Sequence, residues 1–205
     1  MPKYLGSWQK KARALGFSLR RNKQEFSRGK KRTTPPGIQG GKRKKKSPYA
    51  DKLREKQRVK NNYGLRDYQL KNKYVEARIK SGDTATNLLT RLESRLDNLV
   101  FRSGLINTLP FARQWVVHGH FLVNGKKVKS PDWQVKPGQI IGLRKEKMHE
   151  NKLIKGNLEK NTKLPPFLDL NKQKLNITYL RYPAMEELDE GINTSLVMEW
   201  YDKKV

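Results

Sequence analysis

The order of apolar and polar residues divides the chain into stretches of different periodicity. Residues 1–47 hold few apolar positions and are interrupted by Pro-Pro-Gly and Gly-Gly, so they predict an extended arm that orders only on a partner. Residues 51–63 and 66–80 carry helical patterns, each followed by a glycine that can end a helix. Later in the chain the period changes to two, which is typical of strands.

The clearest helical pattern spans residues 85–103. Its apolar positions form one stripe, which consists of Leu88, Leu89, Leu92, Leu96, Leu99 and Val100. Arg91, Arg95 and Arg102 fall within a narrow arc of the same pattern. We therefore expect one helix that buries leucines and presents a row of guanidinium groups. A merely solvated face, or pairing with Glu93 and Asp97, is the alternative interpretation.

The second half of the chain predicts a small mixed domain. Thr108 can begin a short helix that ends at His118. Asn124-Gly125 between two apolar runs predicts a hairpin with a type I′ turn. Further strands are expected at 139–143, 167–170 and 175–180, followed by a final helix that Asn193 caps. The predicted fold class is α+β, with helices packed on an antiparallel sheet.

Charge narrows the range of partners. The chain has 205 residues and a formal net charge of +27, of which residues 1–95 carry +21 and residues 96–205 carry +6. A compact body with this charge repels itself and needs a polyanion, of which nucleic acid is the commonest. The sequence lacks the run of about 20 apolar residues that a membrane span requires. We expect a cytoplasmic nucleic-acid-binding protein.

Several kinds of chemistry find no support in the sequence. The chain has no cysteine, which excludes a disulfide framework, a thiolate nucleophile and a cysteine zinc site. His118 and His120 lack a third ligand at suitable spacing, so no metal site is predicted. There is no Gly-rich phosphate loop and no nucleophile with a placed base, so we predict neither an enzyme nor a cofactor.

Several motifs resemble one protein family. They are Tyr4-Leu5-Gly6, the run from Leu53 to Val59 with Tyr63-Gly64, Asn87-Leu88-Leu89, Arg95-Leu96-Asp97-Asn98, Ala112-Arg113-Gln114 and Val123-Asn124-Gly125. In this order and at these spacings the chain resembles the bacterial type of small-subunit ribosomal protein four, the S-four family. Two features depart from that family: a zinc knuckle of cysteines is missing, and no histidine follows Pro36-Gly37 in the loop that ends at Gly40.

The resemblance implies an architecture and a role. It implies a basic arm over 1–47, a helical domain over 48–92 joined by 186–205, and an inserted RNA-binding domain over 93–185 with its core motif at 95–143. Members of the family bind a helix junction in the 5′ domain of small-subunit ribosomal RNA and nucleate assembly. They also contact neighbouring ribosomal proteins near the messenger entry path and influence translational accuracy.

The candidate RNA-binding residues are cations and polar groups spread along this architecture. Recognition of a folded RNA depends on phosphates, 2′-hydroxyls and shape, which many cations at fixed positions can contact. The arginine fork suits phosphate oxygens in particular. The candidates are Lys3, Tyr4, Arg43, Lys44, Arg54, Lys56, Gln57, Arg58, Lys60, Arg91, Arg95, Arg102, Arg113, Gln114, His118, Asn124, Gly125, Lys126 and Lys127.

Three other classes of protein compete with this interpretation. An RNA-modifying or tRNA-charging enzyme can carry the same module, but it needs a catalytic domain that residues 1–95 do not predict. A non-ribosomal rescue factor is usually shorter and lacks the N-terminal motifs. A DNA-compacting protein fits the charge but not the motifs.

Overall fold

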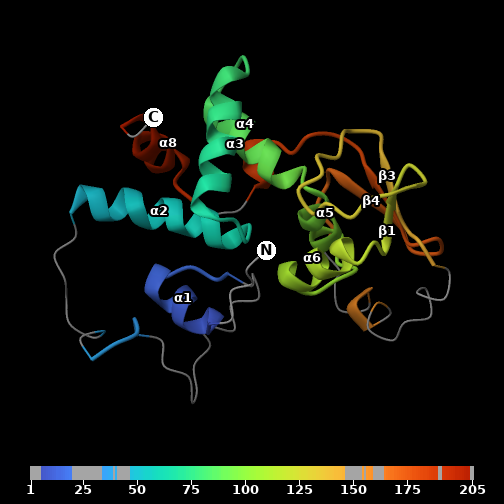
Figure 1. Ribbon diagram of the computed structural model, residues 1–205, viewed down its shortest axis with the longest axis horizontal. Coiled ribbons are helices and arrows are strands. Elements are labelled where there is room, and N and C mark those ends of the chain that lie inside the picture. Colours follow the sequence, from blue (N-terminus) through green and yellow to red (C-terminus); the bar gives the residue numbers. More distant parts are fainter. Residues whose placement is uncertain are drawn as a thin grey trace. The chain divides into compact units, whose positions relative to one another are not determined.

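The computed structural model of the chain is shown in Figure 1, and it describes residues 6–19, 34–38, 40, 47–145, 154, 156–158, 164–188 and 191–203. They fall into two compact units. Unit 1 runs from the N-terminus to Lys71 and resumes at Glu190, and unit 2 spans Asn72–Asp189. The domain boundaries that the sequence predicts, near residues 92 and 185, remain a prediction, because compactness and function need not divide a chain at the same place.

Unit 1 is helical. Helix α2 (Pro48–Asn62) begins after Ser47, whose side chain accepts a hydrogen bond from Ala50 N at 3.2 Å. Helix α8 (Thr194–Asp202) begins at Asn193 with a similar cap, as the sequence predicts, and packs against α2 (Figure 1). The indole of Trp200 lies in this contact, beside the ring of Tyr49. Unit 1 therefore joins both ends of the chain through α2 and α8.

A helix stands in part of the segment that we expected to be an extended arm. Helix α1 (Trp8–Leu15) begins at Ser7, ends at Gly16 and buries Ala12 completely. Arg58 of α2 reaches its last turn, where Nε donates to Leu15 O at 3.0 Å. The expectation is wrong for these residues because a carbonyl-capping arginine and a buried alanine stabilise a turn that composition alone does not favour.

Helix α3 (Asp67–Ile79) leads into helix α4 (Thr84–Glu93) of unit 2. Asp83 caps α4, since its carboxylate accepts from Thr86 N at 2.8 Å. The turn between them is closed by Asn87, whose amide nitrogen donates to the carbonyls of Lys80 and Ser81. The short loop therefore fixes the direction of α4 relative to the last turn of α3.

The single helix expected over residues 85–103 is two helices. Helix α4 ends at Glu93, and helix α5 (Leu96–Arg102) starts after Arg95, which has an extended backbone with ψ of 138°. Arg95 forms an isolated antiparallel bridge with Gln134. The break interrupts the helical arc, so the expected row of three arginines on one helix is wrong.

A five-stranded antiparallel sheet follows helix α6 (Leu109–Val117), in the order β2-β1-β3-β5-β4. The strands are β1 (Phe121–Val123), β2 (Lys126–Lys127), β3 (Ile140–Leu143), β4 (Leu168–Asn171) and β5 (Asn176–Tyr179). The predicted α+β fold is confirmed. Most of residues 144–163, predicted as a charged helix or loop, lie outside the described residues.

The predicted hairpin is confirmed by its register. Val123 pairs with Lys126, which leaves Asn124 and Gly125 as the turn, with φ of 46° and 77°. Positive φ at both residues is the property of a type I′ turn. Asn124 also ties this turn to the next strand, because its Oδ1 accepts from Ile140 N at 2.8 Å.

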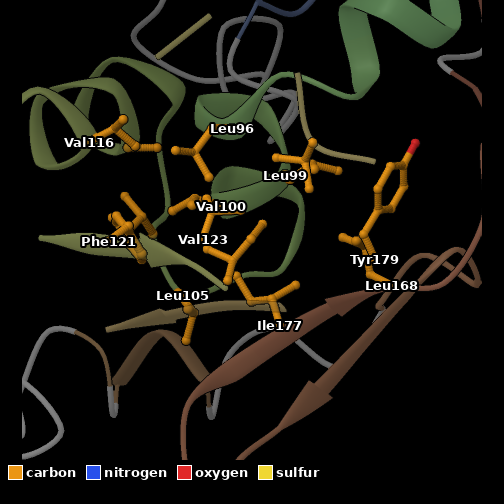
Figure 2. Close-up of a cluster of buried hydrophobic side chains, with 14 of the residues drawn as sticks. Leu96, Leu99, Val100, Leu105, Val116, Phe121, Val123, Leu168, Ile177 and Tyr179 are labelled. Carbon is orange, nitrogen blue, oxygen red and sulfur yellow. The ribbon is translucent and has the colours of Figure 1, made fainter. Parts of the chain in front are cut away.

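One hydrophobic core holds unit 2 together, and Figure 2 shows its central side chains. Leu96 and Leu99 of α5 project toward Phe121 and Val123 of β1, and Ile177 of β5 lies on the same side. All are buried. The sheet and the two short helices therefore form a rigid base for the side chains at their surface. Within the described part of the chain, no helix is long and apolar enough to cross a membrane.

Candidate nucleic-acid interface

Arg95 lies inside unit 2 rather than on its surface. Its side chain is 1% exposed and grips Asp97 in two-pronged fashion, with Nε 3.0 Å from Oδ1 and Nη2 2.7 Å from Oδ2. The third nitrogen, Nη1, donates to Asp132 Oδ1 at 2.6 Å. Lys73 Nζ lies 2.8 Å from the same oxygen. Arg95 thus links the start of α5 to α3 and to the loop after β2.

The other two arginines of the expected row are also paired. Arg102 donates through Nε and Nη2 to Glu93, whose carboxylate is completely buried. Arg91 contacts Glu76 of α3, and its side chain is one-third exposed. Arg113 of α6 lies 3.6 Å from Asp97. The pairing alternative that the sequence left open is therefore what the structure shows for Arg95 and Arg102.

A second group of predicted cations gathers around one carboxylate in unit 1. Lys56 Nζ and Lys60 Nζ lie 2.7 Å and 2.8 Å from the two oxygens of Asp67. Burial raises the pKa of Asp67, but the hydrogen bonds from Lys56 and Lys60 outweigh it and leave that pKa below its usual value. Lys11 lies near Lys60 and donates to Asn61 Oδ1 at 3.1 Å. Three lysines share one acid here.

The remaining candidates of α2 differ in their surroundings. Arg58 pairs with Glu55 at 2.5 Å and holds α1, so its fork is occupied within the protein. Arg54 and Gln57 are half-buried on the same helix. Lys3, Tyr4, Arg43 and Lys44 lie outside the described residues, as does the rest of the basic run 42–46.

The turn of the hairpin and the end of β3 form a basic surface of a different kind. We call it the hairpin surface; its members are His118, His120, Lys126, Lys127, Lys129, Arg144 and Lys145. Antiparallel pairing of Phe121 with Leu143 brings β3 to this place, and Arg144 N donates to His120 O at 2.9 Å. Within the described part of the chain, none of its lysines and arginines forms an ion pair with an acidic side chain.

The proximity of like charges on the hairpin surface shifts two ionisation equilibria. Arg144, a little burial and Lys129 lower the pKa of Lys127. Burial lowers the pKa of His120, and the nearby His118, Lys145 and Arg144 add to that effect. Both directions oppose the charged form, which is expected where cations crowd without acids. An arriving phosphate would relieve this repulsion.

Gly119 permits the crowding. Its φ of 71° lies in the left-handed region, and a Cβ there would lie 2.5 Å from Lys127 Cε and 3.4 Å from Lys129 Cγ. Only a glycine leaves room for these two side chains to pass over the backbone between His118 and His120. The ring centroids of these two histidines are 6.0 Å apart. Among the described residues, no group of three potential ligands could hold a metal ion.

The structure thus divides the predicted site residues of unit 2. Gln114, His118, Asn124, Gly125, Lys126 and Lys127 are exposed at or near the hairpin surface, whereas Arg91, Arg95, Arg102 and Arg113 are paired with acids. Sequence reasoning missed Lys11, Lys129, Arg144 and Lys145. The period-two pattern of β1 and β3 gives their alternation but not their mutual register, and register is what brings Arg144 beside the histidines.

Two family models match consecutive parts of the chain. One is described as the ribosomal protein S4/S9 N-terminal domain and matches residues 3–93; the other is described as the S4 domain and matches residues 94–141. The α+β fold, the basic hairpin surface and these matches define the class of the chain as a ribosomal protein, which is a structural class and not an enzymatic one.

Relatives along the full length define the family. Small ribosomal subunit protein uS4 of Mesoplasma florum is 46% identical, with all of both chains covered. The proteins of that name from Mycoplasma capricolum and Geobacillus kaustophilus are 41% and 42% identical, and at least 99% of each chain is covered. The chain belongs to the uS4 family of ribosomal proteins, which confirms the resemblance seen in its motifs.

Proposed function

We propose that this chain is a structural component of the small ribosomal subunit and binds small-subunit ribosomal RNA. One observation carries the proposal: the hairpin surface holds at least five lysines and arginines, unpaired within the described residues, on a rigid base. A net charge of +27 needs a polyanion, and the curated relatives are named as proteins of the small subunit. The site of action would be the ribosome, in the cytoplasm.

The direct RNA contacts in this proposal come from the exposed residues. Asn124 and Gly125 offer a tight turn that backbone can bring close to RNA, and Lys126 and Lys127 add two cations beside it. Lys129, Arg144 and Lys145 extend the same surface. The paired candidates Lys56, Arg58, Lys60, Arg91, Arg95, Arg102 and Arg113 support it mainly by fixing helices, and reach RNA only where a side chain remains exposed.

The finer role follows from the resemblance of the motifs. We propose that the RNA is a helix junction in the 5′ domain, that binding nucleates subunit assembly, and that the bound protein contributes to translational accuracy. Neighbouring ribosomal proteins near the messenger entry path would be its protein partners. We further propose that residues 93–185 act as the RNA-binding domain, and 48–92 with 186–205 as the helical domain.

A salt titration tests the proposal. The full chain is bound to a transcript of the small-subunit 5′ domain at several salt concentrations, with an unrelated transcript of equal length as competitor. Affinity for the 5′ domain should fall steeply and linearly on logarithmic axes, because phosphate contacts release counterions. A flat response, or equal affinity for both transcripts, would sink the proposal.

Paired charge removals locate the interface. The Lys126→Ala, Lys127→Ala double variant should weaken binding and reduce the salt slope by about one for each lost phosphate contact. The matched control is the Lys172→Ala, Lys174→Ala double variant, which removes two exposed lysines from the β4–β5 turn. Strand β4 is at the opposite edge of the sheet from β2. Equal losses from both double variants would mean bulk charge rather than a defined surface.

A further inference from the structure

Trp133 stands out among the exposed aromatic residues. Within the described residues, four aromatic residues are exposed: Tyr49, Tyr68, Trp133 and Tyr182. Each of the three tyrosines touches another ring or a cation, namely Trp200, Arg66 and Lys80 respectively. In the same part of the chain, the indole of Trp133 has no such contact, although 47% of the residue is exposed. An indole that serves only packing would be covered.

The backbone around Trp133 is firmly held. Trp133 O accepts from Leu96 N at 3.0 Å, and Pro131 O accepts from Asp97 N at 3.3 Å, so this loop caps the start of α5. Val135 N donates to Ser94 O at 2.9 Å. The loop is therefore tied to the α4–α5 junction on both sides of the indole, and the indole itself is left outside.

Side chains tighten the same loop. Asp132, the neighbour of Trp133, receives Arg95 Nη1 at 2.6 Å and Lys73 Nζ at 2.8 Å. Two cations on one carboxylate leave a local excess of positive charge next to the indole. Lys129, four residues earlier, belongs to the hairpin surface. Buried ion pairs thus fix an exposed aromatic residue in cationic surroundings.

We propose that Trp133 contacts RNA by stacking its indole on an unpaired nucleobase. Unpaired bases of folded RNA stack on aromatic side chains, and the surrounding cations can engage the flanking phosphates. A preordered indole loses little conformational entropy on binding, which favours this residue over a flexible side chain. In this arrangement Arg95 is a positioning residue, because it anchors the loop and does not itself reach the RNA. The inference rests on the proposed function.

Two substitutions at position 133 separate stacking from bulk. Trp133→Leu keeps an apolar side chain but has no π face, and Trp133→Phe keeps a ring. Binding of the full chain to the 5′ domain transcript should weaken about 5- to 100-fold for the leucine variant and recover most of the way for the phenylalanine variant. The salt slope should stay at the wild-type value in both variants, since no phosphate contact is lost.

Controls keep the outcomes distinct. Leu180→Ala removes an apolar residue of similar exposure, 52%, from the same unit and should bind as the wild type does. Circular dichroism and thermal unfolding check that each variant folds, and the comparison of leucine with phenylalanine decides between two folded chains. RNA-induced quenching of tryptophan fluorescence should be smaller in Trp133→Phe than in the wild type.

Three results would overturn the inference. They are wild-type affinity in Trp133→Leu, equal weakening in the leucine and phenylalanine variants, and a reduced salt slope in either. Unchanged RNA affinity with impaired joining of later proteins would assign Trp133 to a protein contact instead. If the wild-type chain shows no preference for the 5′ domain, the proposed function fails, which is a separate outcome.

Discussion

Arg102 and Glu93 form a two-pronged ion pair, with Nε 3.0 Å from Oε2 and Nη2 2.5 Å from Oε1. Asn98 Nδ2 donates to the same carboxylate at 2.5 Å. The pair connects the last residue of α5 to the last residue of α4 across the break between them. The bend is therefore held by charge-assisted hydrogen bonds as well as by the leucines beneath it.

Removal of Arg102 should destabilise unit 2. Arg102→Ala leaves the buried Glu93 carboxylate without its arginine, which costs about 3–5 kcal/mol of unfolding free energy. Urea denaturation measures this cost. The control is Arg181→Ala, whose pair with Glu187 is exposed and should contribute less than about 1 kcal/mol. Similar small losses in both variants would contradict a structural role for Arg102.

Lysine should not replace Arg95. A single ammonium group cannot grip Asp97 with two parallel bonds and reach Asp132 as well, so Arg95→Lys should cost about 2–3 kcal/mol of unfolding free energy. Arg54→Lys is the matched control on α2 and should be nearly neutral. A neutral Arg95→Lys, measured in the same urea titrations, would show that the network tolerates a point charge.

The cap of α4 should carry a measurable share of stability. Asp83→Ala removes the acceptor of Thr86 N and should cost about 1 kcal/mol, whereas Asp83→Asn should cost much less. The hydrogen bonds from Thr86 lower the pKa of Asp83, so its contribution is present at neutral pH and is lost as the pH falls through that lowered pKa. Thermal unfolding at pH 7 and under acid conditions checks both statements.

Tyr179 should make stability fall in strong base. Burial raises the pKa of Tyr179 to about 12, although its hydrogen bond with Ser94 acts in the opposite direction. The unfolded chain releases this proton near pH 10, so the unfolded state is favoured increasingly between about pH 10 and 12. The pH dependence of unfolding free energy should be shallower in Tyr179→Phe across that interval. Equal slopes would contradict the assignment.

The hairpin turn should depend on glycine at position 125. Gly125 has φ of 77° and open space where a Cβ would lie, so Gly125→Ala meets strain but no clash and should cost about 1–2 kcal/mol. Lys126 and Lys127 would then be presented less accurately, and affinity for RNA should fall with stability. Gly156→Ala, in open space and without a positive φ, is the control and should be neutral in both assays.

The sequence predicted what depends on local chemistry. Asn124-Gly125 specifies its own turn, and Asn193 and Asp83 cap their helices by bonding amides three residues away. These signals need no information from distant residues. The α+β fold and the family follow from them and from the motifs.

The break at Arg95 could not be predicted in the same way. Residues 85–103 predict one helix because their apolar spacing is continuous, yet the amides of Leu96 and Asp97 bond to the carbonyls of Trp133 and Pro131. Those partners lie far away in the sequence. The conversion of Arg95 from an expected surface cation to a buried anchor is thus a tertiary effect, and it exposes Trp133 in its place.

The missing side chain at Gly119 has a kinetic consequence. Because Lys127 and Lys129 pass close to the backbone there, the cations of the hairpin surface stay near one another and near Arg144. A concentrated positive field acts on RNA before contact and accelerates encounter, whereas the buried pairs around Arg95 act only once the complex exists. A larger residue at position 119 would push the lysines apart, and the chain would capture its RNA more slowly even where the final contacts could still form.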